Sequence, residues 1–362
     1  MKGLVLLTIN TKESCKEGDS VEGTREKRIL LAHGDGGALT YQLIQELFLK
    51  YFTEGPLQQQ NDGALLRDLP GPPVVSTDSF VITPYFFPGG DIGKLAVAGT
   101  VNDLAVTGAE PLYLTVSFIL EEGLLMADLE SIVASLAQTA QEAGVAVVAG
   151  DTKVVEKGRG DGIYINTTGI GFLPEQRELG YQRIEAGDKI LINGTVGDHG
   201  LAILSKRSGL AFDTELRSDC APLNNLIATI LEKCPGAVKF MRDATRGGVA
   251  TTAKEIALAT GKDLLLWEED LPIREEAAGA SEFLGLDPLY MANEGKVLFI
   301  VQGDRAQEVL EVMKEHQLGQ ESAIIGTVEK GKREEGHVLL KTFFGSHRIL
   351  EMMAGDPLPR IC

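Results

Sequence analysis

Short apolar runs alternate along this chain with longer segments in which apolar positions recur every three or four residues. Runs of the first kind are typical of buried strands, and segments of the second kind are typical of amphipathic helices. In the first half, the pattern predicts strands at 29–32, 111–120, 145–150 and 163–172, a pair of strands at 74–83, and helices at 39–52, 92–107 and 127–143. This mixture predicts an α/β fold of mixed α+β character.

The second half of the chain repeats the mixture. It predicts helices at 199–205, 223–232, 248–260, 274–283 and 306–316, with strands at 188–193 and near Leu264, Val297, Ala323 and Val338. Between the halves, the polar segment 173–187 contains Pro174 and Gly180, which favour turns. We therefore expect two domains that meet near residue 180, one at 28–180 and one at 181–350.

Both ends of the chain lack a pattern that would bury them. Residues 1–27 are mostly polar and predict a disordered leader, which leaves Cys15 without a role. Residues 351–362 contain Gly355, Pro357 and Pro359, so they predict a mobile, non-helical tail that ends on Cys362.

Composition narrows the class of protein. With 362 residues, 44% of them hydrophobic, the chain can form real cores. The formal net charge of −18 repels nucleic acid and anionic membranes, so we expect neither as a partner. No apolar run approaches the roughly 20 residues that span a bilayer, and no signal peptide is indicated. The four cysteines form no CxxC pair, which fits a reducing cytoplasm better than a zinc or disulfide scaffold.

The terminal thiol is the most specific candidate for chemistry. Cys362 lies beyond the last predicted core strand, where it has no obvious packing role. About ten residues, at up to roughly 3.3 Å each, can carry the thiol across a domain into an active site. The alternative is a frayed end that finishes in cysteine by chance. Prenylation is excluded, because its signal places the cysteine fourth from the end.

Three aspartates form a second candidate set: Asp78, Asp103 and Asp151. Each follows a predicted strand or lies in an apolar helix, where a carboxylate needs a cation or a donor. Hard oxygen ligands suit Mg²⁺ that holds a polyphosphate, so the three together predict a magnesium nucleotide site. Taken singly, each is equally explained as a cap, a turn or a surface position.

Glycine-rich turns and flanking charges are weaker signals. The turns at 34–37, 89–90, 197–200 and 247–248 could let backbone N–H groups approach phosphate, but none is a Walker motif. Arg246, before the helix that begins at Gly248, indicates an anion site or a simple helix start. Lys153 and Glu294 flank buried strands and could act as acid or base, or be solvated charges. His33 and His199, beside glycines, are explained as well by structural roles.

Taken together, these motifs resemble the HypE family of hydrogenase maturation factors within the PurM-like superfamily. The resemblance covers about 28–362 and rests on the motifs around His33, Asp78, Asp103, Asp151, His199, Asp243 and Glu294, and above all on the ending Pro-Arg-Ile-Cys. It implies a two-domain PurM-like fold with a flexible C-terminal tail, ATP and Mg²⁺ as cofactors, and a homodimer formed through the N-terminal domains. The implied partners in [NiFe] hydrogenase assembly are a HypF-type carbamoyltransferase and a HypC–HypD complex.

The resemblance also implies a reaction. An S-carbamoyl group on Cys362 would lose water to become S-cyanide, with ATP activating the carbamoyl oxygen. Motif matching assigns catalysis to Cys362, Glu294, Lys153 and His33, magnesium to Asp78, Asp103 and Asp151, and the nucleotide to these aspartates with Asn102, Gly36, Gly37, Asp243 and Arg246.

Two alternatives remain open at this point. A related PurM-like kinase or ligase would act on a small molecule in solution, and Cys362 would be incidental. A noncatalytic scaffold would use the tail only as a recognition peptide. A redox role for Cys362 is less favoured, because no second cysteine lies near it in sequence.

Overall fold

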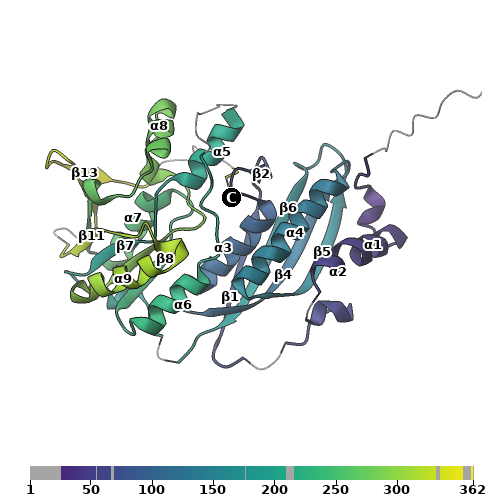
Figure 1. Cartoon of the computed structure of the whole chain (residues 1–362), viewed down its shortest axis with the longest axis horizontal. Helices are drawn as coiled ribbons and strands as arrows, with labels where there is room; N and C mark the ends of the chain where they lie inside the picture. Colours follow the sequence, from purple (N-terminus) through teal and green to yellow (C-terminus); the bar gives the residue numbers. More distant parts are fainter. Residues whose placement is uncertain are drawn as a thin grey trace, which may run out of the picture.

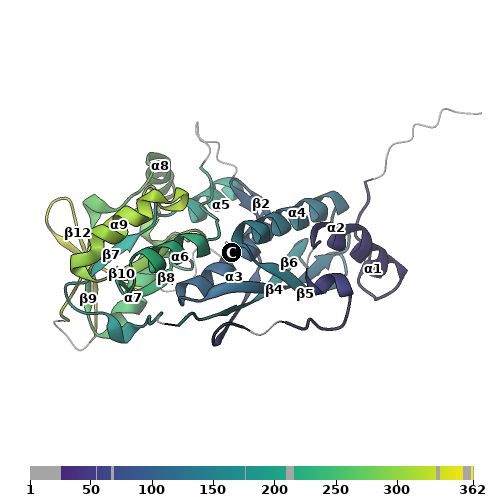
Figure 2. The ribbon, with the colours of Figure 1, turned by 60° about the horizontal axis from the view of Figure 1, so that its bottom comes forward.

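The structure is a computed structural model of the whole chain. Its described residues are 26–53, 55–66, 69–175, 177–208, 216–331, 335–353 and 360–361. Most of the predicted leader, Cys15, the tail segment 354–359 and Cys362 lie outside the described residues. Two lobes lie side by side, and the C-terminal end lies between them, close to β2 (Phe86–Phe87) and α5 (Asp198–Ser208) (Figures 1 and 2).

The first lobe contains a four-stranded sheet in the order β1-β6-β4-β5. The strands are β1 (Pro73–Phe80), β4 (Glu110–Glu121), β5 (Ala146–Val155) and β6 (Ile163–Phe172). Two helices, α3 (Ile92–Val106) and α4 (Met126–Ala143), cover one face of this sheet. Burial alternates along β6, as expected of a strand with one face against helices.

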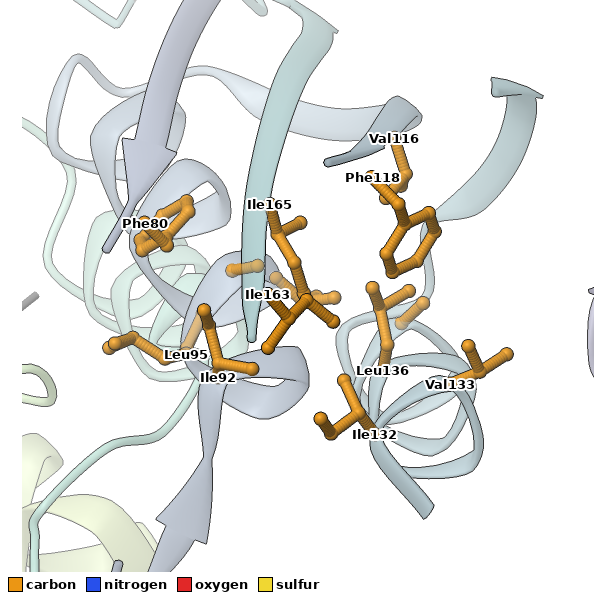
Figure 3. Close-up of a cluster of buried hydrophobic side chains, with 14 of the residues drawn as sticks. Phe80, Ile92, Leu95, Val116, Phe118, Ile132, Val133, Leu136, Ile163 and Ile165 are labelled. Carbon is orange, nitrogen blue, oxygen red and sulfur yellow. The ribbon is translucent and has the colours of Figure 1, made fainter. Parts of the chain in front are cut away.

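The core of this lobe lies between the sheet and the two helices. Figure 3 shows Phe80 and Ile165 from the sheet facing Ile92 and Leu95 of α3 and Leu136 of α4. Gly99 makes this packing possible, since a Cβ atom there would lie 2.9 Å from the Phe80 ring. The predicted pair of strands at 74–83 is instead the single strand β1, which pairs with β6. The other predicted strands and helices of this lobe are confirmed within a few residues, except at its beginning.

The beginning of the fold differs from the prediction of a strand at 29–32. Leu31–His33 is instead a single 3-10 turn (η1), and only Arg28 forms an isolated bridge, to Leu125. The turn is closed by the His33 ring, because Nδ1 accepts the Leu30 N–H at 2.9 Å. The helix predicted at 39–52 is confirmed as α1 (Ala38–Leu43), a π turn and α2 (Leu49–Tyr51).

The second lobe contains a seven-stranded sheet in the order β13-β12-β9-β11-β7-β10-β8. Its strands are β7 (Lys189–Ile192), β8 (Val238–Asp243), β9 (Asp263–Trp267), β10 (Val297–Val301), β11 (Ala323–Glu329), β12 (Val338–Lys341) and β13 (His347–Leu350). Its other helices are α6 (Asn224–Lys233), α7 (Gly248–Thr260), α8 (Glu275–Leu284) and α9 (Ala306–Glu315).

Helices cover both faces of the central strands in this second sheet. Ile190 and Ile192 pack in the cluster that contains α7, whereas Leu191 packs in the cluster that contains α6 and α9. Every residue of β10 is buried for the same reason. β8 and β13 were not predicted, because their polar residues break the apolar run. Within the described residues, no helix is long and apolar enough to cross a membrane.

Candidate functional site

An acidic pocket lies where the two lobes meet. It encloses a cavity of about 380 Å³ and is lined by Asp78 of β1, Asp103 of α3, Asp243 at the end of β8, Arg246, and Glu294 before β10. Asp78 lies on β1 and Asp103 on α3, and the other three residues lie at the end of β8, in the loop after it, or just before β10. The fold therefore brings together two of the three predicted magnesium ligands and three other predicted site residues.

Carboxylates in this pocket repel one another. Burial raises the pKa of Asp103, against the hydrogen bond that Ser76 Oγ donates to Asp103 Oδ2 at 2.8 Å. Burial and the charge of Asp103 raise the pKa of Asp243 to about 6. Arg246 lies 3.7 Å from Asp78 and brings a positive charge to the mouth of the pocket. The pocket therefore favours a cation, or a ligand that carries one.

Glu294 is the most buried of these acids. Burial raises its pKa well above the usual range, and the charges of Asp219 and Asp243 add to this effect. Its Oε1 atom has no hydrogen-bond partner among the described residues. A buried oxygen without a donor is costly, so Glu294 is poised to take a proton or to accept a hydrogen bond from a ligand.

The carboxylates of this pocket suit magnesium that is also bound by water and phosphate. In the described part of the chain no three acidic, histidine or cysteine side chains converge closely enough to hold a metal by themselves. Magnesium keeps several waters and takes ligands from phosphates, so one or two carboxylates are enough. Asp78 and Asp103, facing the same cavity, fit that role.

Asn102, also predicted to bind the nucleotide, is occupied by the protein itself. Its amide donates to the carbonyl of Ala221 at 3.1 Å, and its oxygen accepts the Leu223 N–H at 2.7 Å. The side chain is 3% exposed. In this structure Asn102 ties α3 to the segment 217–223, which lies between the two lobes.

Asp151, the third predicted magnesium ligand, lies away from the acidic pocket. The pairing register puts Asp78 in one row across the sheet with Thr167, Val116 and Gly150. Asp151 follows Gly150, so it belongs to the opposite face of the sheet, on the opposite edge strand. Lys153 Nζ lies 2.6 Å from its Oδ1, and this contact lowers the pKa of Asp151.

Asp151 and Lys153 line a second cavity of about 350 Å³, which we call the β5 pocket. Its walls are apolar where Phe48, Phe52 and Phe118 line it, and Gly36 lies at its edge. Gly37, the next residue, donates its N–H to Asp35 Oδ1 at 2.8 Å. His33, a predicted catalytic residue, closes the neighbouring turn, because its Nδ1 accepts the Leu30 N–H. Within one chain, the predicted site residues thus form two separate groups.

The end of the tail occupies a third location, between the lobes. Ile361 is 5% exposed and belongs to the same buried cluster as Ile203, Cys220 and Ala292. Its carbonyl lies 2.7 Å from Nε2 of the buried His199, and His199 Nδ1 lies 2.7 Å from Ser218 Oγ. Cys362, the next residue, lies outside the described residues.

His199 is neutral in this setting, since burial lowers its pKa from the usual 6.5. A carbonyl oxygen only accepts hydrogen bonds, so Nε2 carries the proton, and Nδ1 accepts from the Ser218 hydroxyl. Ser218 Oγ in turn accepts the Cys220 N–H at 3.1 Å. The series of hydrogen bonds from the Cys220 N–H through Ser218 and His199 to the Ile361 carbonyl therefore pairs each donor with an acceptor.

Comparison with known proteins shows the family. The model for the AIR synthase related protein N-terminal domain matches 61–173, and that for the C-terminal domain matches 185–339. The carbamoyl dehydratase HypE of Azotobacter vinelandii is 48% identical, over 93% of this chain and 98% of that protein. HypE of Escherichia coli K12 is also 48% identical, over 92% and 99%. The chain belongs to the HypE carbamoyl dehydratase family. The predicted family and fold class are confirmed.

Solved structures agree with this family assignment. A crystal structure of HypE in complex with ATP has a TM-score of 0.87 at 47% identity, and covers 92% of this chain and 99% of that one. A HypE–HypF complex has a TM-score of 0.75 at 47% identity, and covers 88% and 100%. A thiamine-monophosphate kinase from Stenotrophomonas maltophilia, at 20% identity and a TM-score of 0.59, shares the fold alone.

The segment 217–223 was not singled out from the sequence of this HypE-family chain, although it supports the site. Asp219 accepts the Glu294 N–H at 3.0 Å and pairs with Lys296 at 3.1 Å. Burial alone would raise the pKa of Asp219, but the Lys296 charge, the neighbouring His199 and the hydrogen bonds from the Glu294 N–H and Lys296 together outweigh it, so the pKa lies below the usual range. No periodic pattern marks this segment, so no signal in the sequence singled it out.

Proposed function

We propose that this chain uses ATP to dehydrate an S-carbamoyl group on its own Cys362 to S-cyanide, and thereby supplies the cyanide ligand for [NiFe] hydrogenase maturation. One observation carries the proposal: Ile361, the residue before Cys362, is buried between the lobes on His199, in the cluster that also contains Ala292, two residues before Glu294. Membership of the HypE family supports the same reaction.

The buried Ile361 shares its cluster with the chain segment that leads to Glu294. Ala292 shares the buried cluster of Ile361 and lies two residues before Glu294. We infer that the S-carbamoyl group reacts in the space between this cluster and the acidic pocket.

ATP supplies the driving force, because transfer of its terminal phosphoryl group turns the carbamoyl oxygen into a phosphate leaving group. The chain's own residues then handle protons and water. A carboxyl with a raised pKa is, once ionised, a stronger base than an ordinary carboxylate, so Glu294 suits removal of the nitrogen protons. The apolar surroundings of Ile361 and Cys220 would keep water from hydrolysing the carbamoyl group.

The nucleotide site is best explained by two subunits. We infer that Asp78 and Asp103 hold Mg²⁺ with the phosphates, that Arg246 and Asp243 line the same site, and that Asp151, Lys153, Gly36 and Gly37 complete the site of a second subunit. The sheet face that carries Asp151 is open, with Val75 63% and Ile119 43% exposed, and the edge strands β1 and β5 each pair on one side only. A homodimer through this face would cover the apolar side chains.

Other proteins complete the pathway. We propose that a HypF-type carbamoyltransferase loads Cys362 and that a HypC–HypD complex receives the cyanide. A solved complex of HypE with HypF supports the first of these partners. We place the reaction in the cytoplasm, where thiols stay reduced, and the free thiols of Cys220 and Cys234 are consistent with this.

Intact-mass spectrometry of the carbamoylated protein tests the reaction. On addition of ATP and Mg²⁺, we expect the loss of one water, located at Cys362 by fragmentation. Omission of ATP and the variant Cys362→Ser are the negative controls. Unchanged mass in the presence of ATP, or loss of water at another residue, would refute the proposal.

A further inference from the structure

The two described residues at the end of the tail are held by both of their carbonyls. The Arg360 carbonyl accepts the Thr83 N–H at 3.3 Å and a hydrogen bond from the Arg207 guanidinium. Arg207 also donates to the Thr83 carbonyl, and the Ile361 carbonyl accepts from His199. Backbone contacts of this kind hold a peptide in register whatever its side chains are.

The side chains of the same two residues are recognised separately. The Arg360 guanidinium pairs with Asp161 at 2.6 Å and donates to Thr83 Oγ1 at 2.7 Å. Asp161 is held in place by the Tyr164 hydroxyl, which donates to it at 2.7 Å. Ile361 fills the apolar cluster already described. A carboxylate and a hydroxyl thus recognise Arg360, and a cluster of buried apolar side chains recognises Ile361.

The tail backbone is bent at Arg360, which has φ of +61°. A non-glycine residue rarely adopts this left-handed conformation, because its Cβ atom crowds the backbone there. The contacts of the groove, rather than the chain's own preference, therefore hold this shape.

The tail has a separate anchor at its base. Glu351 pairs with the buried Lys254 at 3.0 Å, and its carbonyl accepts from the Tyr290 hydroxyl at 2.9 Å. These anchor contacts involve none of the residues that hold Arg360 and Ile361. The described contacts at the base of the tail and those at its end therefore involve different residues.

We propose that Thr83, Asp161, His199 and Arg207 form a peptide-recognition groove that binds a C-terminal segment of the form Arg-Ile-Cys, whether or not that segment is joined to the same chain. Asp161 makes the groove specific for arginine at the second position before the end. The use of such a groove rests on the proposed function, since it would present Cys362 for reaction, but the binding itself does not.

Binding in trans has to compete with the chain's own tail. A tethered ligand on a short linker acts at an effective concentration in the millimolar range, so the native tail masks the groove from a free peptide. The full-length variant Arg360→Ala, Ile361→Ala weakens its own tail and leaves every groove residue in place. Its folding is checked by circular dichroism and by its melting temperature against the wild type.

The probe is a fluorescein-labelled peptide with the sequence Leu-Pro-Arg-Ile-Cys, followed by fluorescence anisotropy without ATP. We expect saturable binding to the double variant, at least tenfold tighter than to the wild-type protein. Replacing the peptide arginine by alanine is expected to weaken binding about tenfold, because a partly exposed ion pair and a hydrogen bond are lost.

A double-mutant cycle assigns the arginine contact. Asp161→Asn, added to the double variant, is expected to weaken the arginine peptide about tenfold and to leave the alanine peptide unchanged. Asp270→Asn, at an exposed aspartate of the other lobe, is the matched control and should change neither. Equal binding to the wild type and the double variant, or independent effects of Asp161 and the peptide arginine, would overturn the proposal.

These outcomes separate the groove from the reaction. Peptide binding without dehydration of Cys362 in the intact protein would leave the groove standing and remove the proposed function. Dehydration in the intact protein without peptide binding would remove the groove alone.

Discussion

Truncation of Ile361 is the sharpest test of tail docking. Ile361→Ala removes three carbon atoms from a side chain that is 5% exposed. At about 0.8 kcal/mol for each buried methylene, the docked state loses about 2.4 kcal/mol, and the ratio of docked to undocked tail falls roughly 60-fold. Ile361→Val removes one carbon and should lower the ratio about fourfold. The rest of the fold keeps its contacts, so the melting temperature should change little.

The rate of alkylation at Cys362 measures the fraction of molecules in which the tail is undocked. Iodoacetamide in excess, on a Cys15→Ser background, reports this thiol by intact mass, because Cys220 and Cys234 are buried. If only the undocked tail reacts, the rate rises in proportion to the undocked fraction, up to the rate of a free peptide. We therefore expect increases of roughly 60-fold for Ile361→Ala and fourfold for Ile361→Val.

The matched control removes the same atoms from an exposed isoleucine. Ile349 of β13 is 49% exposed, so Ile349→Ala should leave the alkylation rate unchanged. Equal rates for wild type and Ile361→Ala would show that burial of Ile361 does not protect the thiol. The reasoning would also fail if Ile349→Ala raised the rate as much as Ile361→Ala.

Four further predictions concern the supporting residues. Asn102→Ala leaves buried backbone groups without partners and should lower the free energy of unfolding by about 1–3 kcal/mol, measured in urea, whereas Asn61→Ala, at an exposed site, should not. The raised pKa of Asp243, about 6 in the folded state against 3.8, means that its contribution to stability is present below pH 3.8 and lost as the pH rises through 6. Asp243→Asn should therefore stabilise the protein at pH 8, by at most about 3 kcal/mol, and hardly at all at pH 4, in urea titrations with EDTA; an equal gain at both pH values contradicts this. Glu294→Gln should abolish the loss of water at Cys362 but leave its alkylation rate unchanged, and a variant that still loses water would exclude Glu294 as the base. The pKa of His199 is lowered from 6.5, so its contribution to stability is present above pH 6.5 and is lost as the pH falls below it. Urea titrations at pH 7.5 and 5.5 should show that the wild type loses more stability on acidification than His199→Gln does, and equal losses would contradict this.

The elements with a strong local pattern could be predicted from the sequence. α7 (Gly248–Thr260) and β6 (Ile163–Phe172) match their predicted bounds, because the apolar period alone defines them. β8 has the sequence Val-Lys-Phe-Met-Arg-Asp, in which pairing with β10 outweighs the local polarity. Its existence depends on a tertiary contact, and no local signal reports it.

The separation of Asp78 from Asp151 could not be predicted in the same way. Both follow apolar residues of a strand, and the sequence alone makes them equivalent. Their faces are decided by the register of β1 with β6, of β6 with β4, and of β4 with β5. A shift of one residue in any of these pairs would move a carboxylate to the other face. Site residues on different strands can be identified by type, but their grouping requires the sheet.

Helix α3 explains how the separate parts of the site can act together. Its neighbouring residues Asn102 and Asp103 point in different directions, because successive helical residues are about 100° apart. Asp103 faces the acidic pocket, whereas Asn102 holds the segment 217–223. That segment fixes the Glu294 backbone through Asp219 and the His199 ring through Ser218. A shift of α3 would therefore move Asp103, the Glu294 backbone and the His199 ring that contacts Ile361 together.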